Sequence, residues 1–445
     1  MPATSLRILV ILPMYGGSLP IGRYCASALR GLGHTVRLFE APLLYPAFTG
    51  LKGLGLTPAQ TVPLENSFLQ VVSQAIWAQV QSLEPHFVLA LAQAPMSRSL
   101  LQRLRRAGVR TAMWFVEDYR IFSYWRTYAP LYDAFAVIQK APFLSELARI
   151  GQAHALYLPL AALPEFHKPL ELSLAEQKEY GSDIAFLGAG YPNRRLAFRP
   201  LAGRDFKIWG SDWEGESLLA GNIQRRGARI SEEESVKVYN AARVNLNLHS
   251  SLQGGDLVGH GDFVNPRTFE LAAMGAFQLV DQRSLLGELF APDELATFTS
   301  MNEFYAGIDH FLAHPEEREA YARRARERTL REHTYERRMD ALLDYLEAEL
   351  GPWPQSGPEQ AAPPELGPQL REDLAQLMRK LGLGPHAAFD DVLARLREQS
   401  GALSDLETSL RLLRTDHIDL YQFHNPAQCY LPGDGTGMFE TMQAF

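Results

Sequence analysis

The chain alternates short, continuously apolar runs with stretches of helical periodicity. The first run, LRILVILP, ends at Pro13 and is followed by a glycine-containing loop, a helical pattern and a second apolar run. Similar runs recur in HFVLALAQ, RTAMWFVED, DAFAVIQKA and ALYLPLA. Strands that are apolar on both faces are typical of parallel sheets with helices on both sides. Residues 1–165 are therefore predicted to form a Rossmann-like, doubly wound α/β domain.

A second series of the same kind begins at SDIAFLGAG and continues through FKIWGS, ARI, VNLNLHS, FQLVD and ATFT. Helical patterns at 232–242 and 267–275 lie between these predicted strands, and a strongly helical run spans 315–350. We therefore predict a second Rossmann-like domain over residues 166–350 that includes this terminal helix. Residues 351–368 are rich in proline and glycine and are predicted to be a linker, followed by an appendage over 369–445.

Composition narrows the class of protein. With 445 residues, of which 46% are hydrophobic, the chain can bury more than one core. A net charge of -8 argues against a nucleic-acid partner, because binding to phosphates depends on lysine and arginine. Two cysteines, Cys25 and Cys429, are too few for a disulfide framework or a cysteine zinc site. The first apolar run is too short to span a membrane, so we expect a cytoplasmic protein without a transmembrane segment; peripheral membrane contact is left open.

Two glycine-containing loops follow predicted strands, where doubly wound domains bind their ligands. Gly16 and Gly17 lie in the first loop and would allow a bound group to approach the backbone closely; a simple tight turn is the alternative. The second loop, FLGAGYPNRRL, has Gly188, with Arg194 and Arg195 at the start of the next helix. Adjacent guanidiniums suit a diphosphate, and a solvated helix end is the alternative.

The segment HGDFVNPRTFELAAMGAFQLVD, residues 260–281, has two carboxylates in a run whose pattern otherwise indicates burial. Pro266 is placed to start a helix, and Glu270 would then lie about one turn inside it. A carboxylate near a helix N-terminus can accept two hydroxyls at once, as the diol of a ribose requires. Glu270 is therefore a candidate ribose ligand, with helix capping as the alternative. Asp262 precedes it by eight residues.

Two further polar residues follow predicted strands. Asp118 lies in WFVEDYRIFSYW after a buried strand and is a candidate to orient or deprotonate an acceptor hydroxyl; capping of the next element is the alternative. His249 ends VNLNLHS, where Asn245 and Asn247 alternate with it, so that all three would face one side of the sheet. His249 is a candidate donor ligand, and a hydrogen-bonded core histidine is the alternative.

The motifs FLGAGYPNRR, VNLNLH, NPRTFELAAMGAFQLVD and HTYERRMDALL resemble those of the CgeB-type family, the spore-maturation-protein-like glycosyltransferases. The resemblance covers residues 6 to about 348. It implies the GT-B fold, in which two Rossmann-like domains face a cleft. Residues 1–165 would then form the acceptor side and residues 166–350 the nucleotide-sugar side.

The resemblance also implies roles for individual residues. Retaining enzymes of this superfamily have an E-x7-E motif, whose first carboxylate faces the donor sugar and whose second binds the ribose; Asp262 and Glu270 occupy those positions. Asp262 is one methylene shorter than the family's Glu. Asp118 and Asp262 are thus the candidate catalytic residues. The candidate donor-binding residues are Gly16, Gly17, Gly188, Arg194, Arg195, His249, Arg267 and Glu270.

The implied reaction is transfer of a sugar from a nucleotide sugar to a glycan, protein or lipid-linked acceptor, with retention of anomeric configuration. No metal and no other cofactor is expected. Two other functions use the same fold and donor site: a sugar-nucleotide epimerase or hydrolase, and a non-catalytic protein that binds nucleotides or glycans.

The C-terminal segment LETSLRLLRTDHIDLYQFHNP resembles a fragment of the aldo-keto reductases, over about residues 400–445. His424 matches the position of that family's active-site histidine. One strand and one helix cannot close an eight-stranded barrel, so no reductase activity is expected. The apolar residues Ile418, Leu420, Tyr421 and Phe423 would be an aggregation hazard if they were exposed.

Overall fold

The structure, a computed structural model, describes residues 5–251 and 261–353, together with 376, 379–380 and 382. Residues up to Pro358 fall into one compact unit, which contains both predicted domains. Apart from 351–353 and the four positions above, the predicted linker and appendage lie outside the described residues. The aldo-keto-reductase-like segment with His424 therefore stays a prediction.

The first domain is built on a six-stranded parallel sheet of order β2-β1-β3-β4-β5-β6. Its central strands are almost entirely buried, which confirms the prediction of a sheet covered on both faces. The strands are β1 (Arg7–Ile11), β2 (Thr35–Phe39), β3 (Phe87–Leu91), β4 (Arg110–Phe115), β5 (Ala134–Val137) and β6 (Ala155–Tyr157).

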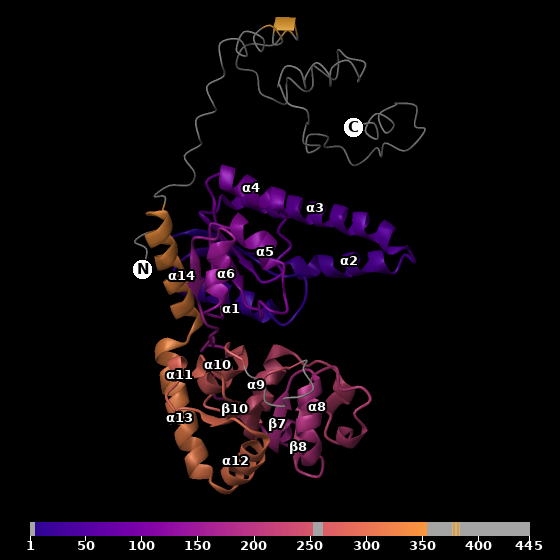
Figure 1. The fold of residues 1–445 in the computed structure, drawn as a ribbon, viewed down its shortest axis with the longest axis vertical. Helices are drawn as coiled ribbons and strands as arrows, with labels where there is room; N and C mark the ends of the chain where they lie inside the picture. Colours follow the sequence, from indigo (N-terminus) through magenta and orange to yellow (C-terminus); the bar gives the residue numbers. More distant parts are fainter. Residues whose placement is uncertain (1–4, 252–260, 354–375, 377–378, 381, 383–445) are drawn as a thin grey trace. The chain divides into compact units, whose positions relative to one another are not determined.

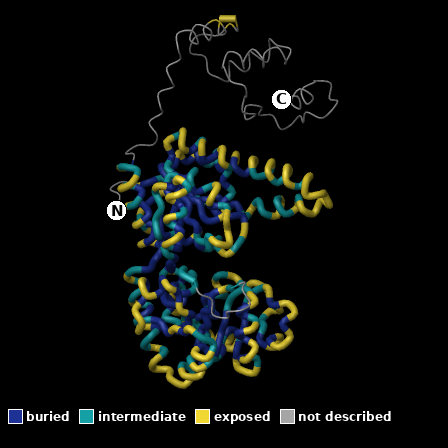
Figure 2. The backbone as a smooth tube through the Cα atoms, in the orientation of Figure 1, coloured by how far each residue is buried: buried dark blue, intermediate teal, exposed yellow. Residues whose placement is uncertain are grey.

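Helices cover both faces of this sheet (Figure 1). Alternate residues of one strand enter different cores: Ile8 and Val10 join the core that includes α1, whereas Leu9 and Ile11 join the core that includes α3 and α4. The helices are α1 (Leu19–Gly31), α2 (Tyr45–Lys52), α3 (Pro58–Leu83), α4 (Arg98–Arg106), α5 (Trp125–Tyr128) and α6 (Phe143–Arg149). Figure 2 shows the buried residues concentrated around the sheet, with the outer parts of α2 and α3 more exposed.

The second domain is built on a five-stranded parallel sheet of order β11-β10-β9-β7-β8. Its strands are β7 (Ser182–Leu187), β8 (Phe206–Trp209), β9 (Ala242–Asn247), β10 (Gln278–Asp281) and β11 (Ala296–Phe298). Its helices are α7 (Leu174–Tyr180), α8 (Pro192–Phe198), α9 (Glu232–Ala241), α10 (Pro266–Met274), α11 (Leu286–Leu289), α12 (Met301–Ala313) and α13 (Pro315–Glu332). The strand predicted at ARI, residues 228–230, is wrong, because Ala228 and Arg229 are exposed in a loop outside the sheet.

The helical run predicted over 315–350 is two helices rather than one. It breaks at His333, and Thr334 caps α14 (Tyr335–Leu350) by accepting a hydrogen bond from Arg337 N–H at 3.2 Å. The apolar stripe of α14 packs against α1 and joins a buried hydrophobic core that contains residues of both domains. Through α1, α14 therefore packs on the first domain, although the sequence analysis included it in the second.

Within the described part of the chain, no helix combines the length and the apolar character needed to cross a bilayer.

Truncating a side chain in the apolar stripe of α14 tests the contribution of this helix to stability. Leu343 is 1% exposed in the shared core, so Leu343→Ala should lower the free energy of unfolding by about 2–5 kcal/mol. Asp344→Ala, one position along on the exposed face, should change it by less than about 0.5 kcal/mol. Urea unfolding followed by tryptophan fluorescence measures both; equal effects of the two substitutions would contradict this packing role.

Candidate functional site

The N-terminus of α10 is fixed by its own sequence. The side-chain oxygen of Asn265 accepts a hydrogen bond from Thr268 N–H at 3.1 Å, and Pro266 occupies the first turn. Gly275 ends the helix in a left-handed conformation, with φ of 65°. The predicted helix start at Pro266 is therefore confirmed. Glu270 lies on this helix, one turn after its start.

A buried polar network anchors this helix end to the sheet. Asn265 N–H donates to His249 Nε2 at 3.0 Å, so the neutral ring carries its proton on Nδ1, which lies 2.7 Å from the Asp281 carboxylate. Burial lowers the pKa of His249. Burial would raise the pKa of Asp281, but His249 and Arg283 hold it below its usual range. A neutral imidazole beside a carboxylate is consistent with both directions.

His249 is therefore corrected from a donor ligand to a positioning residue. It is 3% exposed, and both ring nitrogens are engaged by protein groups. The core-histidine alternative describes it better. Asn247 is likewise buried and donates to Thr268 Oγ1 at 2.9 Å, while Asn245 donates to two backbone carbonyls.

Two guanidiniums lie together beside the first turn of α10. Arg194, on α8, and Arg267, on α10, have their Cζ atoms 5.0 and 5.3 Å from the centre of the same ring, Phe186. A Cβ atom at Gly188 would lie 3.0 Å from Arg267 Nη2, so this loop passes directly by the pair. Burial, followed by the charge of Arg267, lowers the pKa of Arg194 to about 9. Among the described residues, neither guanidinium forms an ion pair with a carboxylate.

Backbone and hydroxyl oxygens hold this arginine pair in place. Arg194 donates to Leu248 O and Ala189 O, each at 3.0 Å. Arg267 donates to Tyr239 Oη at 3.0 Å and also to Leu187 O. Because these partners carry no formal charge, the pair retains its positive charge and is suited to an anion.

Arg195 has a different role from the one predicted. Its guanidinium donates to Gly190 O at 2.7 Å, to Glu214 O at 2.8 Å and also to Asp212 O. All three nitrogens are thus used to join the loop that follows β7 to the loop that follows β8. The predicted phosphate contact of Arg195 is therefore corrected to a structural one.

Glu270 is largely buried and has a perturbed pKa. Its side chain is 17% exposed, and burial raises its pKa to about 7, while Arg267 acts in the opposite direction. His167 Nε2 lies 3.9 Å from Glu270 Oε1. Leu163 N–H donates to His167 Nδ1 at 3.0 Å, so the neutral ring directs its Nε2–H toward the carboxylate. A half-protonated buried carboxyl near neutral pH is typical of a functional site.

The two predicted catalytic carboxylates lie close together, joined by a residue that the sequence analysis missed. Gln139 Nε2 donates to Asp118 Oδ1 at 3.3 Å and to Asp262 Oδ1 at 2.8 Å. Tyr119 N–H donates to Gln139 Oε1 at 3.1 Å and so fixes the direction of the amide. Arg120 Nη2 adds a contact of 3.3 Å to Asp262 Oδ2. This polar group, Asp118, Arg120, Gln139 and Asp262, is called the carboxylate bridge below.

Asp118 also orders its own loop, because its Oδ1 accepts a hydrogen bond from Arg120 N–H at 3.0 Å; it does not cap the next helix, α5, which begins at Trp125. Arg283 binds the backbone next to Asp262, because its Nε donates to Phe263 O at 3.3 Å. A Cβ atom at Gly261 would overlap the Arg283 guanidinium, so a larger residue there would require this side chain to move.

The first glycine loop remains a candidate ligand contact. Gly16 has φ of 109°, which favours glycine, and apart from the adjacent residues no atom of the described chain lies within 4 Å of the position that a Cβ would take at Gly16 or Gly17. The backbone of this loop therefore faces open space, as a donor-binding loop requires.

Some residues of the site escaped the sequence analysis. Gln139 follows β5 directly in AFAVIQK, so its position after a buried strand was a usable signal. Asp281 ends β10 in the same way. For Arg120 and Arg283, no local pattern distinguishes them from surface arginines.

The two parallel-sheet domains have the GT-B fold, which solved glycosyltransferase structures share. The family model of glycosyl transferase-like proteins matches residues 194–344, which include the arginine pair, Asp262 and Glu270. Three solved structures cover 77–78% of this chain: a glycosyltransferase from Rickettsia africae (12% identity, 99% of that chain, TM-score 0.53), sucrose-phosphate synthase from Thermosynechococcus elongatus (14%, 98%, 0.52) and HepE from Anabaena with UDP and glucose (11%, 100%, 0.53).

More narrowly, the chain is similar to the spore protein CgeB of Bacillus subtilis. The two are 24% identical over 257 residues, which make up 55% of this chain and 77% of CgeB. The predicted resemblance to CgeB-type glycosyltransferases is therefore confirmed.

The perturbed carboxyl of Glu270 makes a prediction about stability. Since its pKa in the folded state is about 7 instead of 4.5, the folded state keeps a proton that the unfolded state has lost between these values. The free energy of unfolding should therefore fall as the pH rises through this window. Glu270→Gln removes this loss and should be more stable than the wild type at pH 8 by up to about 3 kcal/mol, but much less so at pH 5.

Urea unfolding of both proteins at the two pH values measures this difference. Glu214→Gln, at an exposed glutamate, is the matched control and should show no such pH-dependent gain. A gain from Glu270→Gln that is the same at pH 5 and pH 8 would contradict the raised pKa.

Proposed function

We propose that this protein transfers a sugar from a nucleoside-diphosphate sugar to an acceptor hydroxyl. One observation carries the proposal: Arg194 and Arg267 form a positive pair without a carboxylate partner among the described residues, beside the first turn of the helix that bears Glu270. The diphosphate would bind the pair and the helix N-terminus, and the ribose diol would bind Glu270. The complex of HepE with UDP and glucose supports a nucleotide-sugar donor and makes UDP the first nucleotide to test.

The arginine pair would act mainly on the leaving group. Departure of a nucleoside diphosphate develops negative charge on the phosphate oxygens, and fixed positive groups that stabilise it lower the barrier. Loss of one such group typically costs about 2.7–4 kcal/mol of transition-state stabilisation. We therefore propose that the reaction needs neither a resident metal nor another cofactor.

The carboxylate bridge would act on the sugar and the acceptor. Asp262 would face the donor sugar, and Asp118 would orient or deprotonate the acceptor hydroxyl. Because Gln139 binds both carboxylates, it would hold the two groups in register. Retention of anomeric configuration is part of the proposal and rests on the D-x7-E pattern of Asp262 and Glu270.

Nucleotide binding tests the donor site. UDP at a hundredfold excess over its Kd should stabilise the wild-type protein by about 2.7 kcal/mol, which a thermal-shift measurement detects. Glu270→Ala and Arg267→Ala should each lose most of this shift. The matched controls Glu214→Ala and Arg229→Ala, at exposed residues, should keep it. If ADP or GDP shifts the wild type and UDP does not, the base is different; if the Glu270 and Arg267 variants shift as much as the wild type, the assigned site is wrong.

Product analysis tests the reaction. Asp118→Asn should slow sugar transfer by about 10²–10⁴-fold while nucleotide binding is retained, because the base acts on the acceptor and not on the donor. Asp344→Asn, on the exposed face of α14, should transfer at the wild-type rate. Release of free sugar or an epimerised donor, with no transfer to any acceptor, would favour the hydrolase or epimerase; binding without turnover would favour a non-catalytic protein.

A further inference from the structure

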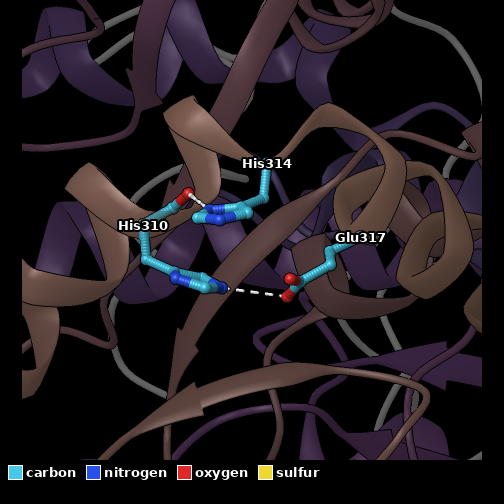
Figure 3. A group of neighbouring side chains, drawn as sticks. All are labelled: His310, His314 and Glu317. Atoms are coloured by element: carbon cyan, nitrogen blue, oxygen red, sulfur yellow. Dashed lines mark hydrogen bonds and ion pairs between the residues drawn. The ribbon is translucent and has the colours of Figure 1, made fainter.

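The corner between α12 and α13 brings together three side chains that can ligate a metal. His310 is in the last turn of α12, His314 lies between the two helices, and Glu317 is in the first turn of α13. Their side chains converge in Figure 3, with the two imidazoles face to face and the carboxylate beside them. We propose that His310, His314 and Glu317 form a binding site for a divalent transition metal such as Zn²⁺.

The distances are within reach of a common ion. The ligand atoms of the three residues all lie within 4.8 Å of one another, and His310 Nε2 is 2.9 Å from Glu317 Oε2. Tetrahedral zinc with bonds of about 2.0–2.2 Å places its ligand atoms about 3.3 Å apart. The ligand atoms therefore need to approach one another by up to about 1.5 Å. The two imidazoles, now stacked with an interplanar angle of 23°, would also have to rotate so that both lone pairs point to the ion, which exposed side chains can do.

The hydrogen bond of His314 leaves the lone pair that metal binding requires, whereas His310 would have to change its tautomer. His314 Nδ1 lies 2.7 Å from His310 O, and since a carbonyl only accepts, Nδ1 carries the proton and Nε2 is left to ligate. A ring N–H bound to a backbone carbonyl is the usual support of a metal-binding histidine. In His310 the ring would take the tautomer with its proton on Nδ1, so that the Nε2 lone pair binds the metal in place of the present contact with Glu317.

The backbone of this corner is held in place before any metal binds. Pro315 begins α13 directly after His314 and restricts the conformation of that residue. Arg318 donates to Leu312 O at 3.2 Å and also to Phe311 O, which satisfies carbonyls at the end of α12. Phe311 packs against Phe277, with ring centroids 4.7 Å apart. Metal binding would therefore cost little backbone conformational entropy, because the backbone of this corner is already ordered.

The donor set selects the class of metal. Two imidazole nitrogens and one carboxylate suit Zn²⁺, Ni²⁺, Co²⁺ or Cu²⁺, whereas Mg²⁺ and Ca²⁺ prefer oxygen ligands. All three residues are exposed, so water can complete the coordination. The site would link the end of α12 to the start of α13. Neither helix supplies a residue to the candidate donor site, so the proposed metal site and the proposed sugar transfer can be tested independently.

Calorimetric titration of the full, untagged chain with ZnCl₂ tests the site. The wild type should bind one Zn²⁺ that is lost or weakened at least about tenfold in His310→Ala, His314→Ala and Glu317→Gln. His154→Ala is the matched control, because His154 is also paired with a single carboxylate, that of Glu349 at 3.3 Å, but belongs to no such triad; it should bind Zn²⁺ as the wild type does. Mg²⁺ should give no comparable binding.

A spectroscopic readout separates this site from histidines elsewhere in the chain. Co²⁺ should give a visible absorption band in the wild type that is lost in the double variant His310→Ala/His314→Ala, and Zn²⁺ should raise the melting temperature of the wild type alone. Circular dichroism checks that the variants are folded. Equal Zn²⁺ affinity of the wild type and the double variant, or no binding by the wild type, would overturn the proposal.

Discussion

The hydrogen bond from Asn265 N–H to the ring of His249 determines where the rest of the site lies. It joins the start of α10 to the end of β9, and Asp281 at the end of β10 fixes the ring from the other side. Because Pro266 and the Asn265 cap then set the helix direction, Arg267 and Glu270 are placed on consecutive turns. One buried neutral histidine thus positions groups that are proposed to bind both the diphosphate and the ribose.

The carboxylate bridge is formed by residues of both domains. Asp118, Arg120 and Gln139 follow strands of the first domain, whereas Asp262 precedes α10 in the second. Each group alone is an ordinary polar residue in a loop. Brought within hydrogen-bond distance, they form a compact set of two carboxylates and two donors, of the kind that can act on a sugar and a hydroxyl at once.

The helix α14 explains how a domain boundary in sequence differs from one in space. Its buried stripe, which includes Met339 and Leu342, packs against α1 of the first domain in a core that contains residues of both domains, although the chain reaches it only after the second domain is complete. Arg338 strengthens the connection by donating to Pro159 O at 2.7 Å, in the segment where the chain first leaves that domain. The chain therefore passes between the two domains twice.

The sequence by itself determined the elements whose signal is local. Continuous apolar runs predicted the parallel strands. Asn265 and Pro266 mark the start of α10 and Gly275 marks its end, because capping and helix periodicity depend on neighbouring residues. The long helix α3 was not identified, since Pro63 and several exposed apolar residues weaken its periodicity. The motifs of residues 194–344 also predicted their resemblance to glycosyltransferases.

The tertiary structure alone decided what each polar group does. Arg194 and Arg195 are adjacent in sequence, yet one lies beside Arg267 as half of a charged pair and the other joins two loops through three backbone carbonyls. His249 became a positioning residue only because both its ring nitrogens met partners distant in sequence. Such roles depend on distances between groups that folding brings together, and a local pattern of residues contains no information about these distances.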